Sequence, residues 1–341
     1  MFKKNMYNKI MNKKGGKMKK ILIGMAVLFS VLMLTGCSEN KEKVIIYSSQ
    51  EIERDEMLEV RFEKEFPEYD IIIQNLPTGN NAAKIKSEGR EIEADIILAL
   101  DTGYMEGLTD NLAELDNFDM SHYLENVNPK HNKYIIGEKY TASLIVNKDY
   151  FEENNLEYPK SYEDLLKEKY NKLLAMPDPK TSGTGYSIYL NVINEKGEKE
   201  ALKYFEKLSK NIKQYTTSGS VPIKLLKQKE IAMAFGLTYQ GVQEINSGNN
   251  YKIIELETKT PYSTAATAII KGKEEKEAVE KVFDYILQDW IPYQASKLVP
   301  SKLFKNQKIE VENYPKNFTD ANMDHIKDYQ KRLELLEMWN Y

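Results

Sequence analysis

Short apolar runs alternate with amphipathic helical stripes along most of this chain. Runs such as VIIY (44–47) and IILAL (96–100) are apolar at consecutive positions, which is typical of strands buried on both faces of a parallel sheet. Between such runs, Leu58, Phe62 and Phe66 recur every four residues and predict an amphipathic helix that Pro67 ends. The first part of the chain is therefore expected to be an α/β unit.

The same alternation starts again near residue 140 and predicts a second α/β unit. A strand in 263–272 is expected to rejoin the first sheet, and helices are expected in 274–290 and 326–339. This order predicts two lobes, 44–139 plus 262–341 and 140–261, with a hinge where the chain crosses and a cleft between them. In the second lobe we expect strands in 141–149, 172–179, 231–240 and 251–258, and helices from Ser161, from Gly185 and across 201–212.

An export signal precedes the two units. Lys19 and Lys20 lead into an apolar run from Ile21 to Leu34, which is too short for a comfortable membrane span and has the length of a signal-peptide core. We expect residues 1–37 to be the signal segment, with translation starting at Met1 or Met18, and residues 38–43 to be a polar tether. A plain transmembrane anchor is the alternative interpretation of the same run.

Removal of this leader changes the charge of the chain. The sequence has 48 basic and 52 acidic residues; without the eight lysines of residues 1–36, 40 basic residues remain, a net charge of about −12. Such an acidic surface argues against nucleic acid as a partner, because phosphate-backbone binding needs a basic patch. The one cysteine, Cys37, cannot form an internal disulfide.

Four loops rich in hydroxyl, amide and glycine groups follow predicted strands: YSSQ (47–50), LDTGY (100–104), KTSGTGY (180–186) and GLTYQG (236–241). Ligands of open α/β sheets collect at the carboxyl ends of strands, and neutral donors at the start of a helix attract an oxyanion. Thr181 or Ser182 could also serve only as a helix cap. The candidate ligand-binding residues are Ser48, Ser49, Gln50, Thr102, Tyr140, Ser182, Gly183, Thr184, Tyr239 and Gln240.

No catalytic signature accompanies these loops. The three histidines, His122, His131 and His325, are scattered outside any H-E-x-x-H arrangement, and TSGTG lacks the lysine of a nucleotide-binding P-loop. Paired carboxylates such as Glu152 and Glu153 fall on charged helical faces. A binding protein without cofactor or resident metal is therefore favoured over a secreted enzyme of similar shape.

Together these segments resemble the extracytoplasmic solute-binding lipoproteins of ABC importers, in the branch that includes ferric-ion and 2-aminoethylphosphonate binders. The resemblance rests on VIIYSSQ, ADIILALD, YTASLIVNKD and FDYILQ, and most specifically on MPDPKTSGTGY (176–186) and on Leu34-Thr35-Gly36-Cys37, which is similar to a bacterial lipobox. It implies a two-lobed type II periplasmic-binding-protein fold, with two mixed sheets flanked by helices, that closes around a ligand.

The resemblance also implies location and partners. Lipid on Cys37 would hold the protein at the outer face of a bacterial cell membrane or in a periplasm. The expected protein is a monomer that passes its solute to an ABC permease with its ATPase.

The resemblance leaves the solute open. Ferric-ion binders of this kind use an adjacent pair of tyrosines and a histidine after the first strand, whereas this chain has Thr238-Tyr239-Gln240 and Gln50-Glu51. An organophosphonate or similar small oxyanion is therefore the favoured solute, with Asp101 or Glu51 available for an amino group. Ferric iron or an iron chelate is the alternative, and a sensory adaptor is a further one.

Overall fold

The computed structural model describes residues 41–125, 127–257, 259–316 and 318–341. In this part of the chain, nine strands form one hydrogen-bonded network in the order β2-β1-β3-β9-β4-β7-β5-β6, and β8 pairs with β4. The strands are β1 (Glu42–Ser48), β2 (Tyr69–Asn75), β3 (Ile96–Asp101), β4 (Ile135–Asn147), β5 (Leu174–Pro177), β6 (Ile212–Thr216), β7 (Met233–Leu237), β8 (Tyr251–Ile254) and β9 (Tyr262–Ile269).

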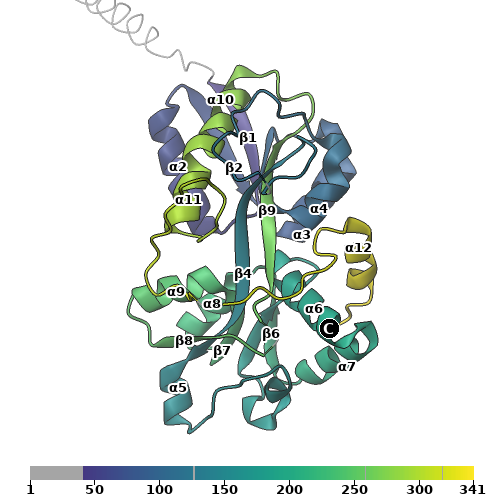
Figure 1. The fold of residues 1–341 in the computed structure, drawn as a ribbon, viewed down its shortest axis with the longest axis vertical. Helices are drawn as coiled ribbons and strands as arrows, with labels where there is room; N and C mark the ends of the chain where they lie inside the picture. The colour runs from purple at the N-terminus through teal and green to yellow at the C-terminus, as the bar shows by residue number, and fades with distance from the viewer. Residues whose placement is uncertain (1–40, 126, 258, 317) are drawn as a thin grey trace, which may run out of the picture. The chain divides into compact units, whose positions relative to one another are not determined.

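Helices flank these strands, with α2, α10 and α11 on the opposite side from α3 and α4 in the upper part of Figure 1. One turn of π-helix, Ile286–Trp290, connects α10 to α11. The helices are α2 (Ile52–Glu65), α3 (Thr78–Glu88), α4 (Thr102–Met105), α5 (Lys148–Glu153), α6 (Gly183–Lys196), α7 (Glu198–Leu208), α8 (Val221–Lys227), α9 (Thr238–Asn246), α10 (Glu277–Tyr285), α11 (Ile291–Lys297) and α12 (Tyr329–Glu337).

Strand β4 belongs to both halves of the network and joins them (Figure 1). Its residues up to Thr141 pair with β9, and those from Ala142 pair with β7 and β8. We call the half built on β1, β2, β3 and β9 lobe 1, and the half built on β5 to β8 lobe 2. The two mixed sheets expected from the sequence are thus continuous through one strand, and the residue bounds given above for the lobes remain a prediction.

The pattern of consecutive apolar residues predicted the strands of lobe 1 well. Strand β3 is buried along its whole length, as expected for a central strand covered on both faces. Leu58 and Phe62 of the predicted helical stripe are buried on α2. The core of lobe 1 therefore forms where sequence periodicity places it.

Two predicted helices differ from the structure. From Ser161 the expected helix is two short 3₁₀ turns, Glu163–Leu166 and Glu168–Tyr170, although Ser161 Oγ does accept from the N–H of Asp164 over 3.1 Å. The helix expected across 201–212 ends at Leu208, and Ile212 begins β6. In both cases tertiary packing overrides a local helical signal.

The C-terminal segment contacts both lobes. Helix α12 packs against α4, whereas the Trp339 ring lies 5.1 Å from those of Tyr189 and Phe205 on α6 and α7, centroid to centroid. The sequence predicted this segment as part of lobe 1 alone.

The leader, Cys37 and residues 38–40 of the tether lie outside the described residues. Within those residues, no helix combines the length and apolarity needed to cross a membrane.

Candidate functional site

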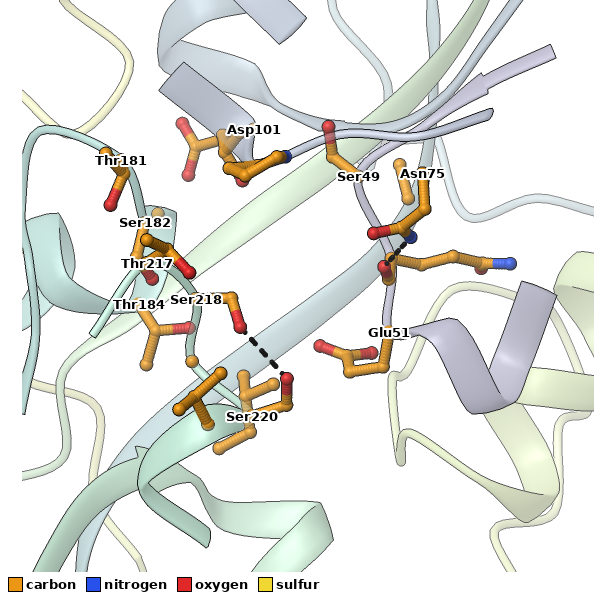
Figure 2. A pocket seen from close by; sticks show the side chains of 18 of the residues that line it. Ser49, Glu51, Asn75, Asp101, Thr181, Ser182, Thr184, Thr217, Ser218 and Ser220 are labelled. Atoms are coloured by element: carbon orange, nitrogen blue, oxygen red, sulfur yellow. Dashed lines mark hydrogen bonds between the residues drawn. The ribbon is translucent and has the colours of Figure 1, made fainter. Parts of the chain in front are cut away.

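A cavity of about 280 Å³ lies between the lobes, where loops that follow several strands meet. Figure 2 shows Thr181, Ser182 and Thr184 on one side of it and Ser49, Glu51 and Asn75 on the other. The serines and threonines that line it are Ser49, Thr78, Thr181, Ser182, Thr184, Thr217, Ser218 and Ser220.

Six of the ten predicted ligand-binding residues line this cavity. They come from the loop after β1, from the strand β4 that joins the lobes, and from the start of α6. The structure therefore brings segments more than 100 residues apart to one place. These six residues are Ser49, Gln50, Tyr140, Ser182, Gly183 and Thr184.

Ser48 and Thr102 are fully buried beside the cavity and do not line it. Ser48 Oγ donates to Asp55 over 2.7 Å, and Thr102 Oγ1 lies 2.8 Å from Thr264 Oγ1. Side chains alternate along an extended chain, so Ser48 points into lobe 1 while its neighbour Ser49 reaches the cavity. The two hydroxyls support the wall of the site from behind.

Tyr239 and Gln240 line a neighbouring cavity of about 250 Å³. The hydroxyl of Tyr239 donates to Oε2 of Glu51 across the lobes. Burial raises the pKa of Tyr239 well above the usual range, so its phenol stays protonated.

The sequence interpretation missed two segments of the cavity wall. One runs from Asn75, the last residue of β2, to Thr78, the first residue of α3, and the other is the run Thr217 to Ser220 between β6 and α8. The second run, TSGS, is rich in hydroxyl groups and glycine like the four loops named in the sequence analysis. The sequence does not reveal it as a loop after a strand, because the helix predicted across 201–212 overlaps the start of β6.

Helices α3 and α6 begin at the cavity. Ser182 caps α6, and its Oγ accepts from the N–H of Gly185 over 3.3 Å. The N–H groups of Gly183 and Thr184, in the first turn, have no partner inside the helix. The positive end of the helix dipole therefore faces the cavity together with free donors.

Two cavity hydroxyls already accept hydrogen bonds from the protein. The side-chain amide of Asn81, on α3, donates to Ser49 Oγ over 2.8 Å, just as the N–H of Gly185 donates to Ser182 Oγ. An oxygen that accepts from the protein keeps its own hydrogen for donation. Both hydroxyls are therefore oriented to donate to a ligand.

Asp101, at the end of β3, is occupied by partners within the protein. Its Oδ1 lies 2.6 Å from the guanidinium of Arg332, and its Oδ2 accepts from Tyr140 over 2.7 Å and from Ser263 over 2.6 Å. A Cβ on Gly183 would lie 2.4 Å from the Tyr140 hydroxyl oxygen, so this close packing needs glycine. Asp101 therefore builds the cavity floor and has little capacity left for an amino group.

Glu51 and Glu138 share the buried guanidinium of Arg54. Burial raises the pKa of Glu138, while Arg54 opposes that shift. Arg54 and Tyr239 both contact Oε2 of Glu51, which leaves Oε1, among contacts of the described residues, as an acceptor at the cavity. The carboxylate of Glu51 thus faces hydroxyl groups of lobe 2 across the cleft (Figure 2), and the ammonium of Lys224 also lines the cavity.

Ala99 lines the same cavity in a strained conformation. Its φ is 56°, and the register of β3 against β9 shifts between Ile97 and Leu100. Left-handed backbone is rare outside glycine and clusters at functional sites. Asp101, two residues after Ala99, is the last residue of β3.

Comparison with known proteins agrees with this architecture. Residues 96–328 match the family described as bacterial extracellular solute-binding protein. The chain belongs to this family. Members bind small solutes and work with ABC permease and ATPase components, and both the family and the solved relatives are binding proteins rather than enzymes.

Individual relatives are distant in sequence but similar in fold. An uncharacterized protein of Haemophilus influenzae is 22% identical over 273 residues, 78% of each chain. The periplasmic binding protein P5PA is 21% identical with a TM-score of 0.74, over 87% of this chain and 98% of its own. AfuA from Actinobacillus pleuropneumoniae, solved with fructose-6-phosphate bound, is 20% identical with a TM-score of 0.74, over 88% and 98%. The two-lobed periplasmic-binding-protein fold is thereby confirmed.

Proposed function

We propose that this protein is the substrate-binding component of an ABC importer and captures a small oxyanion, such as an organophosphonate or a phosphate ester, in the cleft between its lobes. The observation that carries the proposal is the chemistry of the cavity wall. Donors from α3, α6 and the loop at Ser49 converge there, and hydrogen bonds from the protein hold Ser49 and Ser182 in donor orientation. Hydroxyl and backbone N–H donors, with the ammonium of Lys224 beside them, suit an anion better than a cation or an apolar solute.

The opposite wall indicates the rest of the solute. Glu51 offers a carboxylate oxygen across the cavity from the start of α6 (Figure 2). An amino or hydroxyl group on the same molecule would donate to it. An amino-phosphonate or a sugar phosphate has both ends, and fructose-6-phosphate in AfuA has this chemistry.

Closure of the hinge is the proposed mechanism. Solute contacts from both lobes would stabilise the closed form relative to the open one, and the permease would recognise that form. Lipid on Cys37 would keep the protein at the membrane surface.

Ferric iron is a weaker candidate for this site. Hard ferric iron prefers anionic oxygen ligands, whereas the phenol of Tyr239 is held protonated against Glu51. In the described part of the chain, no group of three or more His, Cys, Asp or Glu side chains could hold a metal.

A thermal-unfolding panel tests the proposal. The solutes are 2-aminoethylphosphonate, fructose 6-phosphate, phosphate, sulfate, fructose, spermidine, succinate and ferric citrate. A solute at a hundred times its dissociation constant adds about 2.7 kcal/mol to the free energy of unfolding. We expect the phosphonate or the phosphate ester to give this increase; stabilisation by ferric citrate or spermidine alone would refute the proposal.

A further inference from the structure

A contact between two backbone segments closes one end of the cleft. The N–H of Gly79, in the first turn of α3, donates to the carbonyl oxygen of Thr181 over 3.1 Å. Thr78 and Thr181 line the cavity on the two sides of this contact. The contact therefore joins lobe 1 to lobe 2 at the edge of the site.

Gly79 has no room for a side chain in this arrangement. A Cβ built on it would lie 2.1 Å from the carbonyl oxygen of Lys180 and 3.3 Å from Cα of Thr181. The φ angle of Gly79 is not positive, so its own backbone conformation does not require glycine. The need for glycine comes from the approach of lobe 2.

The opposing loop is held firmly in place by Asp178. Its Oδ1 accepts from the N–H of Lys180 over 2.8 Å, and its carbonyl oxygen accepts from the N–H groups of Thr181 and Ser182 over 3.2 and 2.9 Å. These bonds direct the Lys180 carbonyl toward α3. The loop cannot withdraw from an added methyl group without losing them.

Helix α3 is fixed equally well on its own side. Ala82 and Ile85 are buried in the core of lobe 1, and Asn81 bonds to Ser49. With both segments held, separation of the lobes is the simplest way to accommodate a side chain at position 79.

We propose that Gly79 is a positioning residue for solute capture: its missing side chain lets the lobes meet backbone to backbone, and any larger residue holds the cleft open. The inference rests on the hinge closure proposed above. It assigns to one glycine, outside the set of ligand contacts, control over the population of the closed form.

A salt bridge between the lobes, made by Lys224 at the edge of the cavity, reports closure in the solute-free protein. Lys224 Nζ, on α8, lies 2.9 Å from Glu53 Oε1, on α2, and both side chains are about half exposed. A zero-length carbodiimide reagent joins such an amine to such a carboxylate only while the two groups are in contact. Lys227 and Glu244, 3.0 Å apart within lobe 2, give a reference cross-link that does not depend on closure.

The test compares Gly79→Ala with Asn80→Ala, its exposed neighbour on α3, in the full chain. Cross-linked peptides are quantified by mass spectrometry, with and without fructose 6-phosphate and 2-aminoethylphosphonate, and the affinity of both solutes is measured. In Gly79→Ala we expect the yield of the Lys224–Glu53 cross-link, divided by that of the Lys227–Glu244 cross-link, to fall about tenfold. The affinity for the solutes should fall by the same factor. Asn80→Ala should match the parent. The melting temperature of Gly79→Ala should not fall, because alanine favours a helix over glycine.

Three results would overturn the inference. The first is an unchanged cross-link ratio in Gly79→Ala. The second is a melting temperature of Gly79→Ala below that of Asn80→Ala, which would show that alanine disturbs α3 itself. The third is a parent protein that never forms the Lys224–Glu53 cross-link. If neither solute binds the parent, the proposed solute class is wrong, while the cross-link ratio still decides the role of Gly79.

Discussion

At the scale of single residues, the site depends on side chains that orient others. Asn81 and the Gly185 N–H turn the hydroxyls of Ser49 and Ser182 into donors, and Arg332 occupies Asp101. The sequence identified Ser49 and Ser182 from their position after strands, but it gave no sign that Asp101 would be paired with a residue 231 positions later in the chain. Pairing over such distances is set by the tertiary fold.

Asp55 should make stability depend on pH. It accepts from Ser48, Gln50 and Asn75 behind the cavity wall, and burial raises its pKa from 3.8 to about 6. Because the folded pKa lies above the unfolded one, its contribution to stability is complete below pH 3.8 and is lost as the pH rises through 6. We expect Asp55→Asn, which does not titrate, to gain on the order of 2 kcal/mol relative to the parent between pH 4 and pH 7.

Urea unfolding across this pH range gives the measurement. The absolute stability of Asp55→Asn should be lower, since its amide cannot accept all three bonds. A difference between variant and parent that stays constant with pH would show that Asp55 does not titrate as described.

At the scale of elements, strands were predicted better than the short helices between them. Consecutive apolar residues located β1, β3, β7 and β9 to within a few residues, because burial on both faces leaves a direct record in the sequence. Helix α8, a seven-residue helix, and the 3₁₀ turns after Ser161 left no such record, since tertiary contacts decide short elements. The cavity segment Thr217 to Ser220 was therefore missed as well, because it lies between β6 and the short helix α8.

Helix α12 illustrates an element whose position the sequence did not determine. Its amphipathic pattern predicted a helix, but not that Arg332 would be wholly buried against Asp101, Tyr104 and Tyr186. Arg332→Met should lower the free energy of unfolding by about 3–5 kcal/mol, because it leaves the carboxylate of Asp101 buried without a cation.

The control for this prediction is the next residue along the helix. Lys331 pairs with Glu198 at the surface, so Lys331→Met should cost at most about 1 kcal/mol. Urea unfolding compares the two variants, and the double variant Arg332→Met/Asp101→Asn should recover part of the loss. Equal effects of Arg332→Met and Lys331→Met would contradict the pairing.

At the scale of the whole molecule, two lobes share the strand β4, and the site forms only where they meet. Lobe 1 supplies Ser49 and Glu51, and lobe 2 supplies Ser182 and Thr184. This division is what makes hinge closure and solute capture one event in the proposed mechanism.

One series of calorimetric titrations tests the central claim most directly. Fructose 6-phosphate and 2-aminoethylphosphonate are titrated into the parent, into the double variant Ser182→Ala/Thr184→Val, and into the control Ser87→Ala on the exposed face of α3. Each lost hydrogen bond should weaken binding by about 1 kcal/mol, so the double variant should bind the oxyanion at least about tenfold more weakly while the control binds as the parent does. Fructose, which lacks the anion, should not bind measurably. An oxyanion bound equally well by the double variant and the parent, or fructose bound as tightly as its phosphate, would contradict the account.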